Sequence, residues 1–371
     1  MLPDPRANPI LLGHEAAETA LDAALAGGRL HHAWLITGPE GIGKATLAYR
    51  FARRLLAGRP RSAARAEAGA EPARPNEHHT GEHRPGEPQP SGEGALALDP
   101  AHPVFRRVAA GAHADLITVE RGYDEKRKRV RSVITADDVR RIAGFMALTP
   151  AEGGWRVAIV DGAEDMHPAA ANALLKVLEE PPARAVLLLV SAAPGRLLAT
   201  IRSRCRRLRL APLPDAAIAA LLGRALPDLA EAERARLVTL AEGSPGRALL
   251  LAEAEGLAIA TLVDDVLAGL PNLPPTRAYE IADKIGRAET GFTTFMDLLR
   301  AALAAAVRET LCGRADPAQE RLVALRPLEA WGDVWHGLSK LQDETEGFAL
   351  DKRQAIVAGL ALLAPSAQGS G

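Results

Sequence analysis

The sequence has few cysteines, no long apolar run and almost no net charge. Two cysteines, Cys205 and Cys312, occur in 371 residues, too few for a disulfide framework or a cysteine-based zinc site. No stretch approaches the roughly 18 apolar residues of a membrane span, and the first residues lack the basic-then-apolar pattern of a signal peptide. We therefore expect a cytoplasmic protein of a reducing compartment, without membrane contact.

The charge balance excludes a general attraction to nucleic acid. The formal net charge is −1, so any contact with DNA would have to come from local patches. Apolar residues make up 47% and charged residues 25% of the chain, which is typical of a globular protein. The length allows two or three domains, each with its own core.

The order of apolar runs predicts a parallel α/β domain. The segments 33–37 and 185–192 are short apolar runs, and 155–166 begins as an apolar strand and ends in acids. The helical segment 168–180 begins with proline and stops at two prolines. Such strands alternating with helices indicate a parallel sheet that helices cover on both faces. We also expect a strand at 115–121, with 128–135 as its hairpin partner.

The remaining composition predicts three parts and one insert. An α/β domain extends to residue 211, a helical lid covers 212–256, and an all-helical domain covers 257–371. Residues 59–94 contain almost no large apolar side chain and are rich in Pro, Gly, Glu and Arg. We expect this insert to be disordered, because it cannot bury enough surface to offset its ordering entropy.

The segment "GPEGIGKAT" (38–46) predicts a phosphate-binding P-loop. It follows an apolar strand and opens a helix, so that its glycines and backbone N–H groups would face phosphates that the lysine neutralises. The candidate nucleotide-binding residues are Gly38, Gly41, Gly43, Lys44, Thr46 and, at the end of a later strand, Asp161. A glycine-rich turn without this setting would be weak evidence, compatible with an unrelated strand–helix turn.

The residues needed for hydrolysis are missing from this site. Ala45 has no oxygen for Mg²⁺, and Thr46 lies about 100° further round the helix. Gly162 stands where a hydrolytic ATPase of this kind has glutamate; Glu164 could substitute, although a surface acid is the simpler interpretation. We expect a degenerate site in which ATP is possible but is not hydrolysed.

A second informative stretch, "TIRSRCRRLRL" (200–210), carries five arginines. They could form a solvated edge strand protected by charge, a patch that contacts DNA phosphates, or a source of a catalytic arginine. The basic run at 124–131 is most simply a solvated hairpin tip, with DNA contact as the alternative. Asn172 and Lys176, one turn apart, are either solvated or interface residues.

Three segments together resemble a known family. "HHAWLITGPEGIGKATLA", "AANALLKVLEEPP" and "TIRSRCRRLRL", in this order, are similar to bacterial clamp-loader subunits of the AAA+ class. The resemblance implies a subunit of a five-membered ring in which ATP sites lie between neighbours. Its partners would be the gamma/tau and delta subunits of the same loader and, through the assembled complex, the sliding clamp and primed DNA.

The resemblance also assigns roles to individual residues. Arg204, within Ser203-Arg204-Cys205, would reach the γ-phosphate bound by the adjoining subunit, a contact worth on the order of 10³–10⁵ in rate for related NTPases. Motor subunits carry a nucleotide-sensing arginine in the lid, where this chain has Gly246, with Arg247 displaced by one. The chain thus resembles a subunit that donates an arginine without using its own site; the alternative is an active motor subunit.

One expected feature of the family is missing. Members usually bind zinc through four cysteines after the P-loop helix, where this chain has its cysteine-free insert. His78, His79 and His83 of the insert could bind metal only adventitiously, so we expect no zinc and no other metal site.

Overall fold

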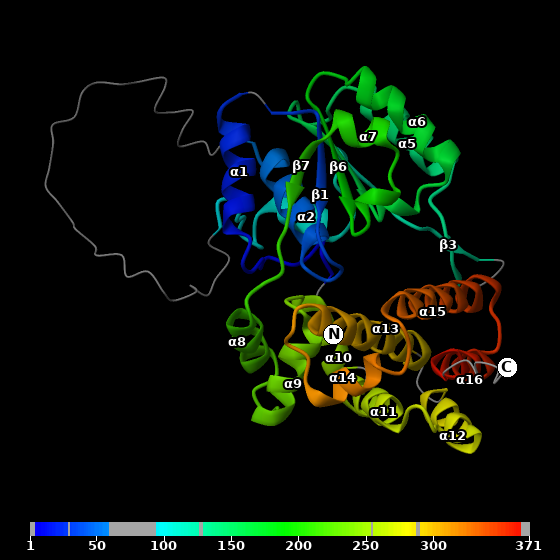
Figure 1. The fold of residues 1–371 in the computed structure, drawn as a ribbon. Coiled ribbons are helices and arrows are strands. Elements are labelled where there is room, and N and C mark those ends of the chain that lie inside the picture. Colours follow the sequence, from blue (N-terminus) through cyan, green and yellow to red (C-terminus); the bar gives the residue numbers. More distant parts are fainter. Residues whose placement is uncertain are drawn as a thin grey trace, which may run out of the picture. The chain divides into compact units, whose positions relative to one another are not determined.

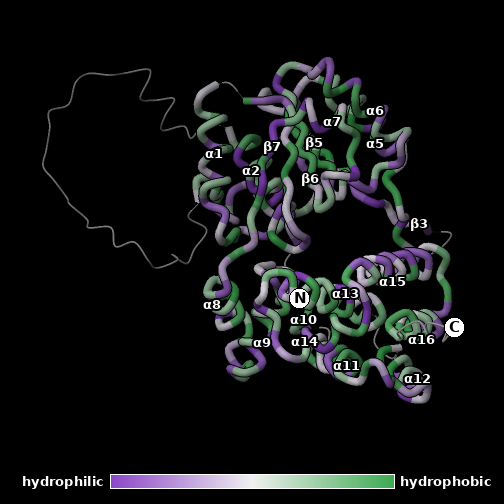
Figure 2. The backbone as a smooth tube through the Cα atoms, viewed as in Figure 1, coloured by the Kyte–Doolittle hydropathy of each residue, from purple (hydrophilic) through white to green (hydrophobic). Residues whose placement is uncertain are grey.

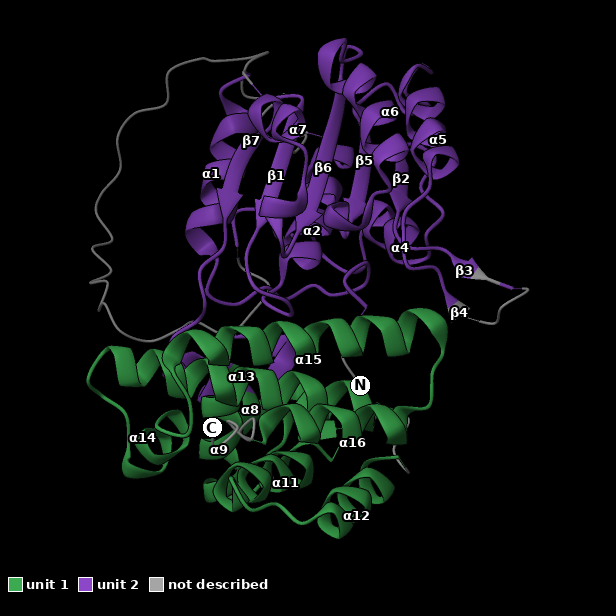
Figure 3. Ribbon diagram, turned by 45° about the vertical axis from the view of Figure 1, so that its right-hand side comes forward, with its two compact units in different colours: residues 1, 222–241, 248–371 green, residues 2–221, 242–247 purple. Residues whose placement is uncertain are grey.

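The computed structural model describes residues 4–28, 30–58, 94–125, 129–253, 255–286 and 290–364. They belong to two compact units, one of residues 2–221 with 242–247 and the other of residues 222–241 with 248–371 (Figure 3). Residues 59–93 of the predicted insert, including its three histidines, lie outside the described residues. The division at 211 and 256 stays a prediction.

The larger unit contains a five-stranded parallel sheet in the order β2-β5-β6-β1-β7 (Figure 1). Its strands are β1 (Ala33–Thr37), β2 (Leu116–Val119), β5 (Arg156–Asp161), β6 (Ala185–Ser191) and β7 (Arg206–Arg209). The strands β1 and β6 are buried along their whole length, as their continuous apolar sequences require. The predicted parallel α/β fold is confirmed.

Helices cover both faces of the sheet because alternate strand residues point to opposite sides. Ala33 and Leu35 belong to a core shared with α5 (Ala136–Met146), α6 (Pro168–Glu179) and α7 (Ala199–Arg204). Trp34, which lies between these two residues in the strand, points to the opposite face, where its ring contacts that of Phe51 in α2 (Lys44–Leu56). The helices α1 (Glu15–Ala26) and α4 (Pro103–Ala109) pack against α2. The sheet interior is correspondingly hydrophobic in Figure 2.

The hairpin predicted around the basic run is wrong in its pairing. Segment β2 lies in the main sheet, parallel to β5. The antiparallel pair is instead β3 (Tyr123–Asp124) with β4 (Arg129–Val130). In the structure β2 is the edge strand of the main sheet, where it forms a parallel ladder with the buried strand β5 and buries Val119.

The smaller unit is helical, as predicted. The remaining elements of the chain are the short helices η1 (Ala163–Asp165) and η2 (Pro194–Arg196), then α8 (Asp215–Ala225), α9 (Glu231–Ala241), α10 (Pro245–Glu253), α11 (Gly256–Gly269), α12 (Pro275–Ile285), α13 (Gly291–Leu311), α14 (Pro317–Val323), α15 (Leu328–Phe348) and α16 (Lys352–Leu363). Among the described helices, none is both long and apolar enough to cross a bilayer.

Candidate nucleotide and arginine sites

The predicted phosphate loop joins the carboxyl end of β1 to the first turn of α2. Gly38, Gly41 and Gly43 have φ angles of 155°, 69° and 101°, in the region that favours glycine. A Cβ on Gly38 would lie 2.7 Å from the Leu210 carbonyl oxygen. The backbone therefore has the shape of a phosphate cradle that only glycine can form.

Lys44 lies at the start of α2 with its side chain almost fully buried. Its Nζ donates a hydrogen bond of 2.6 Å to the carbonyl oxygen of Pro39, within the loop itself. Burial lowers the Lys44 pKa, and the nearby carboxylates Glu164, Glu40 and Asp161 oppose that effect. The lysine that would neutralise a phosphate thus has a partner in its own loop.

The residues around the loop fit a phosphate group but not a catalytic magnesium ion. Ala45 offers no hydroxyl, and the neighbouring Thr46 is buried in α2. Asp161 is the last residue of β5. Its pKa is raised, mainly by burial and to a lesser extent by the negative charge of Glu120. Magnesium needs a nearly complete shell of oxygen ligands, and this donor set lacks the hydroxyl that the helix start would supply.

Glu164 is not the surface acid that the sequence suggested. One of its carboxylate oxygens accepts hydrogen bonds from the backbone N–H groups of Ala192 and Ala193, at 2.7 and 3.1 Å. The half-buried side chain therefore caps the end of β6. Gly162 precedes it with a φ of 72°, a turn conformation rather than a strand-end one.

A turn some 200 residues away along the chain binds the phosphate loop, which sequence reasoning missed. The Ser244 hydroxyl donates to the Glu40 carbonyl at 2.7 Å, and the Gly246 amide donates to the Gly41 carbonyl at 2.9 Å. Arg247 instead pairs with Glu242, at 2.8 Å. Gly246, where the resemblance predicts the absence of a sensing arginine, is thus in direct contact with the loop.

The N-terminal segment is held against the loop helix by buried arginines. Arg53 donates to the carbonyl oxygens of Arg6 and Asn8, and its guanidinium lies 4.4 Å from the Phe105 ring centroid. Arg50 binds the carbonyl of Pro9 and the carboxylate of Glu18. Burial lowers the pKa of Arg53 to about 10, so it remains charged at neutral pH.

The structure separates the roles of the arginines at 200–210. Arg202 donates to the Pro194 carbonyl, and Arg206 lies over the ring of Trp34. Arg207 and Arg209 are exposed on the edge strand β7. Arg204 ends α7, half-exposed, and pairs with Glu179 at the end of α6.

The other surface candidates stay apart from the loop. Asn172 and Lys176 are exposed on α6, and residues 126–128 of the basic run lie outside the described residues. His32 donates a hydrogen bond from Nε2 to the Leu178 carbonyl, and its ring stacks on that of His31. Among the described residues, no group of His, Cys, Asp and Glu is arranged to hold a metal ion.

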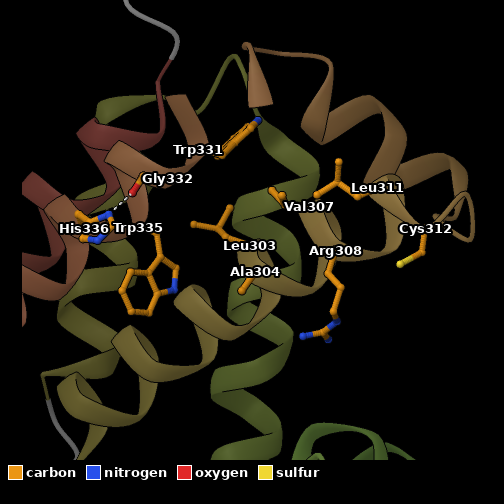
Figure 4. Close-up of a pocket in the computed structure, with 10 residues that line it drawn as sticks. All are labelled: Leu303, Ala304, Val307, Arg308, Leu311, Cys312, Trp331, Gly332, Trp335 and His336. Carbon is orange, nitrogen blue, oxygen red and sulfur yellow. Dashed lines mark hydrogen bonds between the residues drawn. The ribbon is translucent and has the colours of Figure 1, made fainter. Parts of the chain in front are cut away.

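The smaller unit contains an apolar cavity of about 460 Å³ between α13 and α15 (Figure 4). Trp331 and Trp335 face Leu303 and Val307 across it, with Arg308 at its rim. This lining has too few polar groups to orient a nucleotide. The cavity is therefore no alternative to the P-loop as a nucleotide site.

Comparison with known proteins finds similarity to one family over part of the chain. The family described as DNA polymerase III, delta subunit, matches residues 98–214. DNA polymerase III subunit delta-prime of Pseudomonas aeruginosa is 39% identical over 62% of this chain and 58% of its own length. The Escherichia coli delta-prime subunit is 35% identical over 62% of this chain and 57% of its own.

Subunits of a second kind match at lower identity. The gamma/tau subunit of Mycobacterium tuberculosis is 28% identical over 58% of this chain and 30% of its own length. Among solved structures, the match to the Thermotoga maritima RuvB Holliday junction branch migration motor covers 71% of this chain and 67% of that protein at 17% identity. The TM-score of this match is 0.38, which is too low to support a conclusion about fold or function.

The matches have a limited extent. The chain spans a little under three fifths of the length of the delta-prime relatives, 58% and 57%. Within that extent, the resemblance expected from the three motifs is confirmed: over 62% of its length the chain is similar to the delta-prime subunits of bacterial DNA polymerase III.

Proposed function

We propose that this chain acts as the delta-prime subunit of a cytoplasmic clamp loader, which places the sliding clamp on primed DNA during replication. In that role it assembles with gamma/tau and delta subunits, and its C-terminal helices take part in the assembly. The similarity to delta-prime and gamma/tau subunits supports this assignment. Contacts with clamp and DNA would be made by the assembled complex.

Within the complex, Arg204 completes the ATP site of a neighbouring subunit. The observation that carries this role is the position of Arg204 at the exposed end of α7, whereas Arg202 and Arg206 are engaged by Pro194 and Trp34. A charged guanidinium with free N–H donors is suited to the charge that develops on a transferred phosphoryl group.

The chain's own P-loop does not hydrolyse ATP in this proposal. Lys44 is bonded to Pro39, Ala45 supplies no metal ligand, and Gly246 leaves no sensing arginine above the loop. The glycine cradle could still bind a nucleotide phosphate through Gly38, Gly41, Gly43 and Lys44. Nucleotide binding without turnover is therefore compatible with this role.

The test is DNA-stimulated ATPase activity of a reconstituted clamp loader that carries changes in this subunit alone. We expect Arg204→Ala to reduce turnover on the order of 10³-fold at the neighbouring site, while Lys44→Ala leaves it nearly unchanged. If Lys44→Ala were the damaging change and Arg204→Ala harmless, the chain would be an active motor subunit instead.

A further inference from the structure

We propose that Glu179 is a positioning residue for Arg204, holding its guanidinium ready for a phosphate bound by a neighbouring subunit. This inference rests on the proposed function, which supplies the ligand of Arg204. It joins two segments, the end of α6 and the end of α7, that lie 25 positions apart (204 − 179) in the sequence.

Two contacts fix the guanidinium of Arg204. Its Nη2 lies 3.0 Å from Oε1 of Glu179, and its Nη1 donates to the carbonyl oxygen of Thr200 at 3.1 Å. A guanidinium has five N–H donors, so these contacts leave about three of them free. With 38% of its side chain exposed, Arg204 is held in place and can still bind an anion.

The backbone at Glu179 is held in place by the structure around the end of α6. It is the last residue of α6, which ends before Pro181 and Pro182 because proline cannot continue the helix. The carbonyl of the preceding residue, Leu178, is bonded to the ring of His32 at 3.1 Å, next to β1. The backbone just before Glu179 is therefore tied to the residue that precedes β1.

The electrostatics favour a cation at this point. A carboxylate at the C-terminal end of a helix faces the negative end of the helix dipole, an unfavourable position unless a positive charge is near. Arg204 provides that charge. The adjacent thiol of Cys205 does not compete for the arginine, because burial raises the pKa of Cys205 to about 12 and keeps it neutral.

In the opposite role, the carboxylate of Glu179 would compete with the phosphate for the guanidinium of Arg204 and so reduce its binding to the phosphate. The two roles predict opposite signs for its removal. Positioning requires activity to fall, because an unheld arginine loses rotamer freedom on meeting its ligand. Competition requires activity to rise.

The experiment measures DNA-stimulated ATPase of the reconstituted loader with Glu179→Ala, Glu179→Gln, Arg204→Ala or the Glu179→Ala/Arg204→Ala pair in this subunit. Glu180→Ala is the matched control, since this exposed neighbour pairs with no arginine among the described residues. Gel filtration verifies that every variant enters the complex.

We expect Glu179→Ala to lower kcat about three- to fivefold, the upper range for an exposed ion pair, with the KM for ATP unchanged. Glu179→Gln, which keeps a hydrogen-bond acceptor, should lose less, and the double variant should equal Arg204→Ala alone. Wild-type or faster turnover of Glu179→Ala, with Arg204→Ala inactive, would refute positioning but leave the proposed function standing. A harmless Arg204→Ala would instead refute the proposed function.

Discussion

The amide of Gly246 donates a hydrogen bond to the carbonyl oxygen of Gly41, and the two glycines approach each other closely. A Cβ on Gly246 would lie 2.8 Å from both Cα and O of Gly41. A Cβ on Gly41 would lie 2.6 Å from the Ser244 hydroxyl. A side chain at position 246 would therefore collide with the backbone of the loop unless the turn moved away.

Adding a methyl group at this contact should destabilise the fold. We expect Gly246→Ala to lower the free energy of unfolding by about 1–3 kcal/mol, the usual cost of overpacking. Gly223→Ala is the control, since a Cβ at this position in the last turn of α8 meets nothing within 4 Å. Urea unfolding followed by circular dichroism measures both, and equal stability of the two variants would contradict the tight contact.

The buried ion pair between Glu18 and Arg50 should contribute more to the stability of the fold than the partly exposed pair of Asp22 with Arg54, which joins the same two helices. Both partners are 3% exposed, so Glu18→Ala leaves an uncompensated buried charge and should cost about 3–5 kcal/mol. Asp22→Ala removes the partner of Arg54, 20% exposed, and should cost about 1 kcal/mol or less. Comparable losses in urea unfolding would show that Arg50 finds another partner.

His14 should make the protein less stable in mild acid. The Nε2 atom of His14 forms a hydrogen bond with the Ile42 carbonyl of the phosphate loop. Burial lowers the pKa of His14, and this effect outweighs the hydrogen bond to Ile42 and the negative charges of Glu15 and Glu18, which raise it. The unfolded chain then binds more protons than the folded one, so stability falls as the pH drops below about 6.5.

Glutamine at position 14 keeps a donor for Ile42 but cannot be protonated. His14→Gln should therefore flatten the loss of stability between about pH 6.5 and 5. It should not abolish the loss, because burial also lowers the pKa values of His32 and His113. An unchanged pH profile of the unfolding free energy would exclude a contribution from His14.

The two cysteines should differ sharply in reactivity. Burial raises the pKa of Cys205 to about 12, whereas Cys312 is exposed. Because the thiolate is the reactive form, one equivalent of thiol should react quickly with Ellman's reagent at about pH 8, and two after denaturation. Cys312→Ser should remove the fast reaction; its persistence would place Cys205 at the surface.

Local sequence signals predicted much of this fold. The strands around Leu35 and Leu188 are apolar runs in the sequence, and Thr135 and Asp138, three residues apart, form the capping box of α5. The glycine pattern likewise predicted a tight loop before α2, since residues other than glycine rarely adopt the positive φ angles found at Gly38, Gly41 and Gly43; phosphate binding by this loop stays a prediction.

Contacts between distant segments were not predictable in this way. Nothing near Gly41 in the sequence indicates that Ser244 and Gly246 bind its loop. The pairing of Glu179 with Arg204 likewise depends on how α6 and α7 pack, and Arg53 in an apparently amphipathic helix is buried because backbone carbonyls of the N-terminal segment satisfy it. Such partners are fixed by tertiary packing rather than by local pattern.

The parallel pairing of β7 with β1 has a consequence for assembly. Trp34 is in register with Arg206, so Arg204 precedes one end of this strand pair while Gly38 follows the other, about 13 Å away along four residues. Arg204 and the phosphate loop therefore lie toward opposite ends of the strands and belong to different surfaces of the unit. Under the proposed function, the neighbour that receives Arg204 and a neighbour that meets the phosphate loop would contact these two different surfaces, which is a head-to-tail arrangement.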